Sequence, residues 1–317
     1  MPDSAPPREA VSVIAQEFLV DEPCALSVNI PGAHTHLRPG PADTDRVEID
    51  VSVTGCSPEE AEDILNRMQV GTHQMKDTVR VYSDVDADRS DADWWRWVRT
   101  LDVAIHVDLR LPSRVEAEIH AAGGSVDIAD LQGHVDLKVM GGPCTAKNLQ
   151  GTLDIRAESS DVSIQGFSGD QVVARVAVGA LTMEKIQANT VTVRSVSAPT
   201  RLDAVDGPTT ITAKGSTVDL HALPGPCTAT VEGGRLHFDG APDEEVELSV
   251  VGTSLDAALP ADHGADLTMT GPDLSLADAF SFEGERTGDE IDGVLNDGGP
   301  PIALRASGAG RIHCHPS

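Results

Sequence analysis

Aromatic residues are scarce in this chain of 317 residues: they make up 3% of it, as three Trp, one Tyr and five Phe. Aliphatic side chains supply the apolar volume instead, because the hydrophobic fraction still reaches 40%. That fraction is enough to form a large core, which excludes a wholly disordered acidic chain. The core is therefore expected to consist mainly of Val, Leu, Ile and Ala.

Long apolar runs are also missing, because no stretch of 18 residues is apolar throughout. A transmembrane helix is therefore not expected, and neither is membrane insertion. The first twenty residues lack both a basic segment and a clean apolar segment, as a secretory signal would need. If Met1 is the native start, a cytoplasmic location follows, and a surface location would require a non-classical route or a trimmed chain.

Positive charge is in short supply, since 23 Lys and Arg face 51 Asp and Glu, for a net charge of -28. A surface of this sign repels phosphate, which excludes nucleic acid as a partner. The excess of Asp over Glu and of Arg over Lys is typical of proteins from high-salt cytoplasm, where counterions screen self-repulsion. A GC-rich genome produces the same bias, and the two explanations weigh about equally.

Paired cysteines and catalytic signatures are absent as well. The five cysteines are odd in number and show no C-x-x-C spacing, which disfavours a disulfide framework and a four-ligand zinc module. No G-x-S-x-G, H-E-x-x-H, P-loop or Rossmann pattern occurs. The sequence thus implies no cofactor and leans away from an enzyme.

What the chain does contain is a repeat of eighteen to nineteen residues. Counting from Gly133, apolar or small residues stand at offsets 2, 4, 6, 11, 13 and 16. The same pattern restarts at Gly151, Gly207, Gly225, Glu244 and His263, and after a one-residue shift at Gly169 and Ala188. The segment from Ser113 fits with two extra residues in its turn.

Each unit predicts two short strands, because offsets 2, 4 and 6 alternate, as do offsets 11 and 13. One such unit cannot bury its own apolar face, so successive units must stack. The predicted fold is an all-β parallel β-solenoid, or β-helix, with 18–19-residue coils. An antiparallel meander is the less favoured alternative.

Residues 1–112 predict an N-terminal segment that caps the solenoid or forms its first coils. Alternating strands precede a helix over 58–69, for which Ser57, Pro58 and Glu60 form a typical start. Residues 113–317 then hold the repeats. An irregular segment over 280–317, which ends in a last strand pair, is expected to close the array.

The sequence resembles a bacterial family of proposed adhesins built from β-strand repeats. The resemblance rests on units such as GTLDIRAESSDVSIQGFSGD, on the N-terminal pattern EFLVDEPCALSVNIPGAHTHL, on the lead-in VDLRLP and on the closing TGDEIDGVLNDGGPPIALRASGAGRI. It extends over nearly the whole chain and implies a solenoid with an adhesive role. The family offers no catalytic residues to transfer to this sequence.

Outward positions of the second strand supply the main candidate site. If the coils are in register, two columns of polar side chains form, one of Arg201, Asp219, His237 and Asp256 and the other of Asp203, His221 and Asp239. Histidines among carboxylates bind divalent metals or polar polymers, and they supply acid–base groups to polysaccharide lyases and hydrolases. A merely solvated acidic face is the more ordinary interpretation.

Three further groups are weaker candidates. His34 and His36 form an H-x-H pair suited to a metal, and comparison with residues 124–128 predicts that both point inward. His313 and His315 are expected to face outward at a frayed terminus. Trp94, Trp95 and Trp97 suit stacking on a sugar or anchoring of a partner, although a hydrophobic plug is the simpler role.

These observations favour a non-enzymatic structural or adhesin-like module that presents flat faces to an unknown protein or glycan. A carbohydrate-active enzyme that uses the His/Asp face is one alternative, and a deep groove beside that face would favour it. A self-associating cytoplasmic scaffold, in which solenoid ends stack, is the other.

Overall fold

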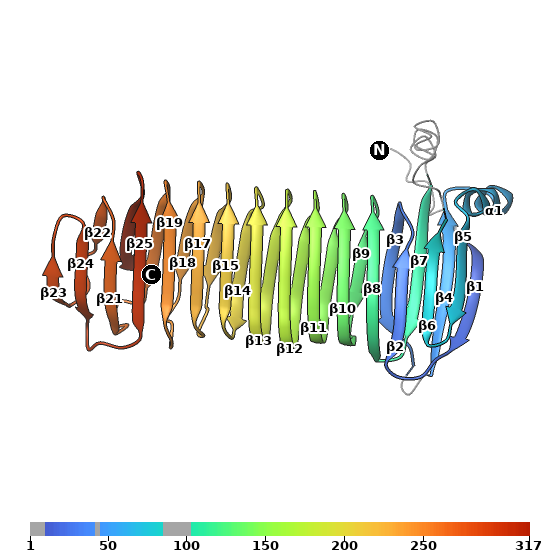
Figure 1. The fold of residues 1–317 in the computed structure, drawn as a ribbon, viewed down its shortest axis with the longest axis horizontal. Helices are drawn as coiled ribbons and strands as arrows, with labels where there is room; N and C mark the ends of the chain where they lie inside the picture. The colour runs from blue at the N-terminus through green and yellow to red at the C-terminus, as the bar shows by residue number, and fades with distance from the viewer. Residues whose placement is uncertain (1–9, 42–44, 85–102) are drawn as a thin grey trace, which may run out of the picture. The chain divides into compact units, whose positions relative to one another are not determined.

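A computed structural model gives the structure of residues 10–41, 45–84 and 103–317. Within these residues the protein is nearly all β, with 26 strands of one large open sheet and a single helix (Figure 1). The chain divides into two compact units, residues 1–146 and residues 147–317.

The first unit has its strands in two ladders. Its elements are β1 (Val11–Leu19), β2 (Cys24–Asn29), β3 (Ala33–Pro39), β4 (Arg46–Thr54), α1 (Pro58–Arg67), β5 (Val70–Met75), β6 (Thr78–Ser83), β7 (Ala104–Leu111), β8 (Arg114–Ala122), β9 (Val126–Ala129) and β10 (Gln132–Met140). In one ladder β2 lies in parallel between β6 and β8, and in the other β3 lies in parallel between β7 and β9. The early pair β2–β3 is therefore inserted between strand pairs that come later in the chain.

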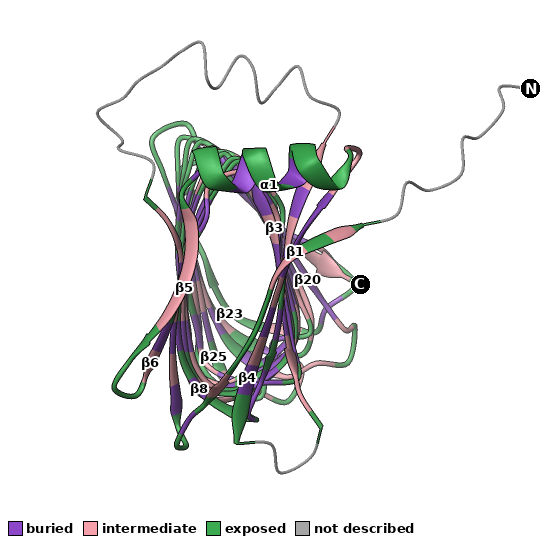
Figure 2. Cartoon of the chain, turned by 90° about the vertical axis from the view of Figure 1, so that its right-hand side faces the viewer, coloured by how far each residue is buried: buried purple, intermediate pink, exposed green. Residues whose placement is uncertain are grey.

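Helix α1 confirms the helix predicted from the sequence, and it ends two residues earlier than expected. The Ser57 hydroxyl accepts a hydrogen bond from the backbone N–H of Glu60, and the Glu60 carboxylate accepts one from the backbone N–H of Ser57. This capping box satisfies two amides that the helix cannot pair itself. Ala61, Ile64 and Leu65 form the buried face of the helix, which lies across the two ladders at one end of their strands (Figure 2).

The second unit begins with long strands of 15 or 16 residues, which are followed by strands of seven residues or fewer. Its elements are the end of β11 (Cys144–Glu158), β12 (Val162–Ala177), β13 (Leu181–Val196), β14 (Thr200–Asp206), β15 (Thr209–Lys214), β16 (Thr217–His221), β17 (Cys227–Glu232), β18 (Arg235–Asp239), β19 (Val246–Val251), β20 (Ser254–Leu259), β21 (Ala265–Thr270), β22 (Leu274–Leu276), β23 (Phe282–Arg286), β24 (Glu290–Leu295), β25 (Pro301–Ser307) and β26 (Arg311–Pro316). From β12 to β20 the neighbouring strands pair in parallel. The antiparallel meander is therefore wrong for these strands.

The sequence predicts that the last strand pair closes the array. The structure instead places this pair, β25 and β26, between other strands. β25 pairs in parallel with β19 on one side and β21 on the other, and β26 pairs with β20 and β22. In Figure 1 the dark red β25 lies between β19 and β21. Antiparallel β24 and β23 instead extend the ladder of β19, β25 and β21, because β24 pairs with β21 and β23 pairs with β24. Insertion lets both backbone edges of β25 and β26 form ladder hydrogen bonds, whereas a terminal strand pair would leave one edge unpaired.

The core follows the apolar offsets of the repeat. Leu220, Leu236, Phe238 and Leu255 are all at most 1% exposed, and outward residues alternate with them along each strand. The predicted inward positions are buried at almost every offset, with Ala241 and Ala279 as exposed exceptions in loops beyond the strands. A period of two is required for a strand with one buried face, so the alternation that was visible in the sequence identified this face correctly.

Four of the five cysteines are buried free thiols, and this predicts a reactivity pattern. Burial raises the pKa of Cys24 to about 11 and the pKa values of Cys144, Cys227 and Cys314 to about 12. Because the thiolate is the nucleophile, these four should resist iodoacetamide at pH 8. We expect mass spectrometry to find slow labelling of half-buried Cys56 alone in the folded protein and of all five in guanidinium. Rapid labelling of Cys227 without denaturant would contradict this burial.

Candidate functional site

The strand register aligns the polar residues expected on the outward face of the second unit. Asp219 on β16 pairs in register with Arg201 on β14 and His237 on β18, and His237 pairs with Asp256 on β20. In the neighbouring column His221 is in register with Asp203 and Asp239. All of these side chains are half-buried except Arg201, which is exposed and forms an ion pair with Asp203 at 3.4 Å.

Two residues that sequence reasoning left at a frayed end extend the same columns. His313 on β26 is in register with Asp256, and His315 is in register with Ala258. Both histidines belong to a strand that is paired on each side, so the frayed-terminus prediction is wrong. The H-x-H spacing did show that both imidazoles share one face of a strand. It gave no indication that β20 would be the neighbouring strand.

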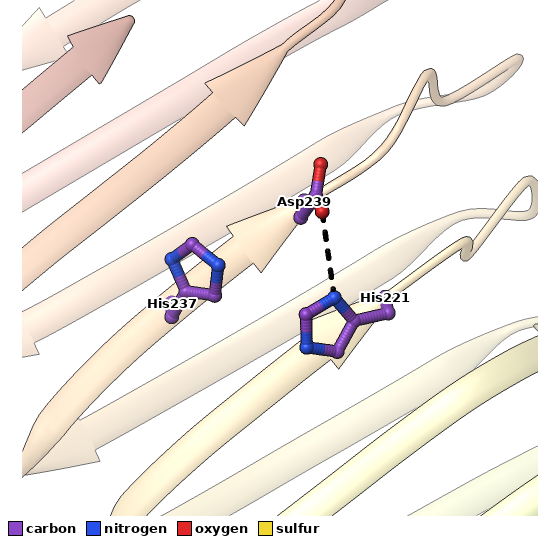
Figure 3. A group of neighbouring side chains, drawn as sticks. All are labelled: His221, His237 and Asp239. Atoms are coloured by element: carbon purple, nitrogen blue, oxygen red, sulfur yellow. Dashed lines mark ion pairs between the residues drawn. The ribbon is translucent and has the colours of Figure 1, made fainter. Parts of the chain in front are cut away.

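The first cluster on this face consists of His221, His237 and Asp239 (Figure 3). The Nδ1 atom of His221 lies 3.6 Å from Oδ2 of Asp239, and the rings of His221 and His237 have centroids 5.6 Å apart, edge to face. One potential ligand atom from each residue lies within 4.8 Å of the others. The geometry thus joins an imidazole and a carboxylate across adjacent strands.

The second cluster surrounds Asp256 with three imidazoles. Oδ1 of Asp256 lies 3.2 Å from Nδ1 of His313 and 3.3 Å from Nε2 of His315, while Oδ2 lies 3.4 Å from Nδ1 of His237. The Nδ1 atom of His315 is 2.7 Å from the carbonyl oxygen of Pro316. Since a carbonyl only accepts, this contact places a proton on Nδ1 and directs Nε2 toward the carboxylate.

An open pocket of about 380 Å³ lies beside Asp256 and His313. Its lining also includes Arg235, Asp273 and Arg311, so acidic and basic groups both reach it. Such a pocket accommodates an ion or part of a polar ligand. It is close to the lower end of the volumes typical of small-molecule sites, which enclose most of the ligand's surface.

His34 and His36 do not point into the core of the first unit, so that prediction is wrong. Thr35 between them is 2% exposed, and both imidazoles are half-buried on the outward face of β3. His34 stacks on His106 with ring centroids 5.3 Å apart, and Nδ1 of His36 lies 3.5 Å from Oδ1 of Asp108. Burial, reinforced by His106 and His36, lowers the pKa of His34 and so favours its neutral form.

An open groove of about 830 Å³ lies beside His36 and is also lined by Arg38, Asp50, Asp108 and Arg110 among others. In the described part of the chain, two groups of three side chains have potential metal-ligand atoms within 4.8 Å of one another, and neither group includes His34 or His36.

Trp94, Trp95 and Trp97 lie outside the described residues, so the roles suggested for them stay predictions.

Comparisons with known proteins give few matches. No protein-family model and no curated protein matches the sequence. Among solved structures, the chain is similar to a proposed adhesin from Bacteroides fragilis, with 11% identity, a TM-score of 0.36 and coverage of 95% of this chain and 96% of that one. It is also similar to a proposed cell-adhesion protein from Clostridium sporogenes, with 9% identity, a TM-score of 0.25 and coverage of 96% and 99%. The one helix among the described residues, α1, is not long and apolar enough to span a membrane.

Proposed function

We propose that this protein is a non-enzymatic binding module built as a parallel β-solenoid. The outward face of β14, β16, β18, β20 and β26 is its binding surface, and its partner is a polar protein or glycan. The observation that carries the proposal is the in-register alignment of charged and imidazole side chains across these five strands. Such a regular row matches a partner with repeated polar groups better than a compact small molecule.

The solenoid form is supported by the spacing of the parallel ladders. Val162 pairs with Leu181, Val218 with Leu236 and Leu236 with Leu255, which are separations of 19, 18 and 19 residues. When a chain returns beside itself every 18 or 19 residues, each strand lies next to the corresponding strand of the preceding coil. The scarcity of aromatic residues fits the narrow aliphatic interior of such a coil.

A carbohydrate-active enzyme is the second candidate, and the three imidazoles around Asp256 favour it. The His–Asp contacts of 3.2 to 3.4 Å lie at or just beyond the reach of about 2.6–3.2 Å that proton transfer needs, and such contacts shorten when an enzyme binds its substrate. The neighbouring pocket is open and small, however, whereas catalysis benefits from a site that excludes water. Binding without turnover therefore agrees better with the described surface.

The test is a binding screen of the full chain against glycan and protein panels, with release of reducing sugar measured in parallel. We expect the variant Asp219→Asn/His237→Gln to bind the best ligand at least tenfold more weakly. A matched control, Thr228→Ala/Thr230→Ala, alters outward residues of β17 in the other ladder and should bind normally. Equal binding by all three proteins would exclude this face, and sugar release lost only in the first variant would establish the enzyme instead.

A further inference from the structure

We propose that Asp256, His313 and His315 bind one divalent transition-metal ion of the Zn²⁺ class. Asp256 supplies Oδ1, His313 supplies Nδ1 and His315 supplies Nε2. Two imidazoles and a carboxylate form a ligand set that zinc uses in proteins when a fourth position is left for water or a partner's donor atom. This inference does not depend on the proposed partner binding.

The distances within the cluster suit a small tetrahedral ion. Ligand atoms at about 2.0–2.2 Å from Zn²⁺ lie roughly 3.3–3.5 Å from one another in a tetrahedron. The two imidazole nitrogens lie 3.2 and 3.3 Å from Oδ1 of Asp256, and all three ligand atoms are within 4.8 Å. The two imidazole nitrogens are themselves within 4.8 Å of each other, so small side-chain rotations can adjust them to the spacing of a tetrahedral site.

The hydrogen bond of His315 to Pro316 is the second observation that points to a cation. Because Nδ1 donates to the Pro316 carbonyl, a neutral His315 ring presents a lone pair at Nε2. That lone pair faces a carboxylate oxygen at 3.3 Å, and two acceptors at this distance repel each other. A metal ion between them removes the repulsion, and a backbone carbonyl that fixes the tautomer is the usual support of a metal-binding histidine.

The surroundings of Asp256 hold more imidazoles than one carboxylate can pair with as ions. Asp256 is in contact with three imidazoles, including His237 on its other oxygen, and one carboxylate balances only one positive charge. His237 then orients the carboxylate from Oδ2 as a positioning residue, in the manner of outer-shell partners that hold metal ligands.

The surroundings allow an ion to enter from solvent. The side chains of Asp256, His313 and His315 are 39%, 51% and 29% exposed. Asp273 in the adjoining pocket adds negative charge, while Arg235 and Arg311 oppose it. The net charge of -28 attracts divalent cations to the molecule as a whole.

The test is titration of the chelator-treated full chain with Zn²⁺ by calorimetry, and with Co²⁺ by visible absorption. We expect one equivalent to bind at this site, with the absorption of tetrahedral Co²⁺ that Zn²⁺ then displaces. Asp256→Asn and His315→Gln should each weaken binding at least tenfold, because loss of an outer-shell partner alone costs about 10–100-fold. Circular dichroism of each variant establishes that it is folded.

Two control variants separate this site from the other histidine clusters. His221→Gln tests the cluster with Asp239, and His36→Gln tests the histidines of β3, and both should keep the equivalent bound by wild type. Binding that survives Asp256→Asn, or that disappears only in a control variant, would overturn the proposal. Because the ligand is Zn²⁺ alone, absence of a glycan or protein partner leaves the result unaffected.

Discussion

Replacing Gly234 by alanine is expected to destabilise the protein by about 3 kcal/mol, the upper end of the usual cost of overpacking. Gly234 lies in the turn between β17 and β18, directly beside Ser216 in the corresponding turn of the preceding strand pair. A Cβ atom on Gly234 would overlap the carbonyl oxygen of Ser216, and its carbonyl carbon and amide nitrogen as well. Backbone cannot rotate away as a side chain can, so the two turns must separate.

The neighbouring Gly233 offers a control in the same turn. Nothing lies within 4 Å of a Cβ atom built there, although its φ of +65° is a conformation that disfavours alanine. Gly233→Ala should therefore cost only about 1–2 kcal/mol, the penalty for a left-handed L-residue. Urea unfolding of both variants, followed by circular dichroism, measures the difference. Equal costs would mean that the turns are not stacked as closely as the structure has them.

The columns on the candidate face were predictable because they depend on local periodicity. Once the offsets of Val218, Leu220 and Leu236 marked the inward face, the positions of Asp219, His221 and His237 on the other face followed. A strand alternates with a period of two, and parallel stacking adds only the spacing between units. The helix start at Ser57 was equally local, because a capping box involves residues three positions apart.

The inserted strand pairs were not predictable, because they depend on pairing between distant segments. β26 reaches β20 across a separation of more than fifty residues, as in the pairing of Asp256 with His313. Nothing in the pattern of residues 301–316 distinguishes insertion from addition at the end. The Asp256 cluster was therefore invisible in the sequence, although each of its members had been identified as polar and outward.

The error at His34 and His36 has a simple physical cause. Comparison of the two sequence segments matched His34 with Val126, whereas the structure pairs Thr35 with Val126. A shift of one residue in a strand moves every side chain to the opposite face. Thr35 is accordingly buried, and both histidines point outward.

Replacing Phe238 by alanine should destabilise the protein by about 3–5 kcal/mol, the range for removal of a large aromatic side chain from a core. Phe238 is 1% exposed and is one of the largest fully buried side chains among the described residues. It pairs in register with Leu220 on one side and Ala257 on the other. The small Ala257 cannot fill the space that the ring would leave, so a cavity should persist among the buried side chains around position 238.

The adjacent His237 distinguishes a core effect from a general weakness of β18. Its side chain faces outward and is 29% exposed, and its Nδ1 atom lies 3.4 Å from Oδ2 of Asp256. Exposed pairs of this kind contribute about 0–1 kcal/mol, so His237→Ala should cost far less than Phe238→Ala. Urea unfolding of both variants measures the contrast. Similar losses would mean that residues 237 and 238 do not face opposite sides of the sheet, and the alternation behind both the core and the candidate face would then be wrong.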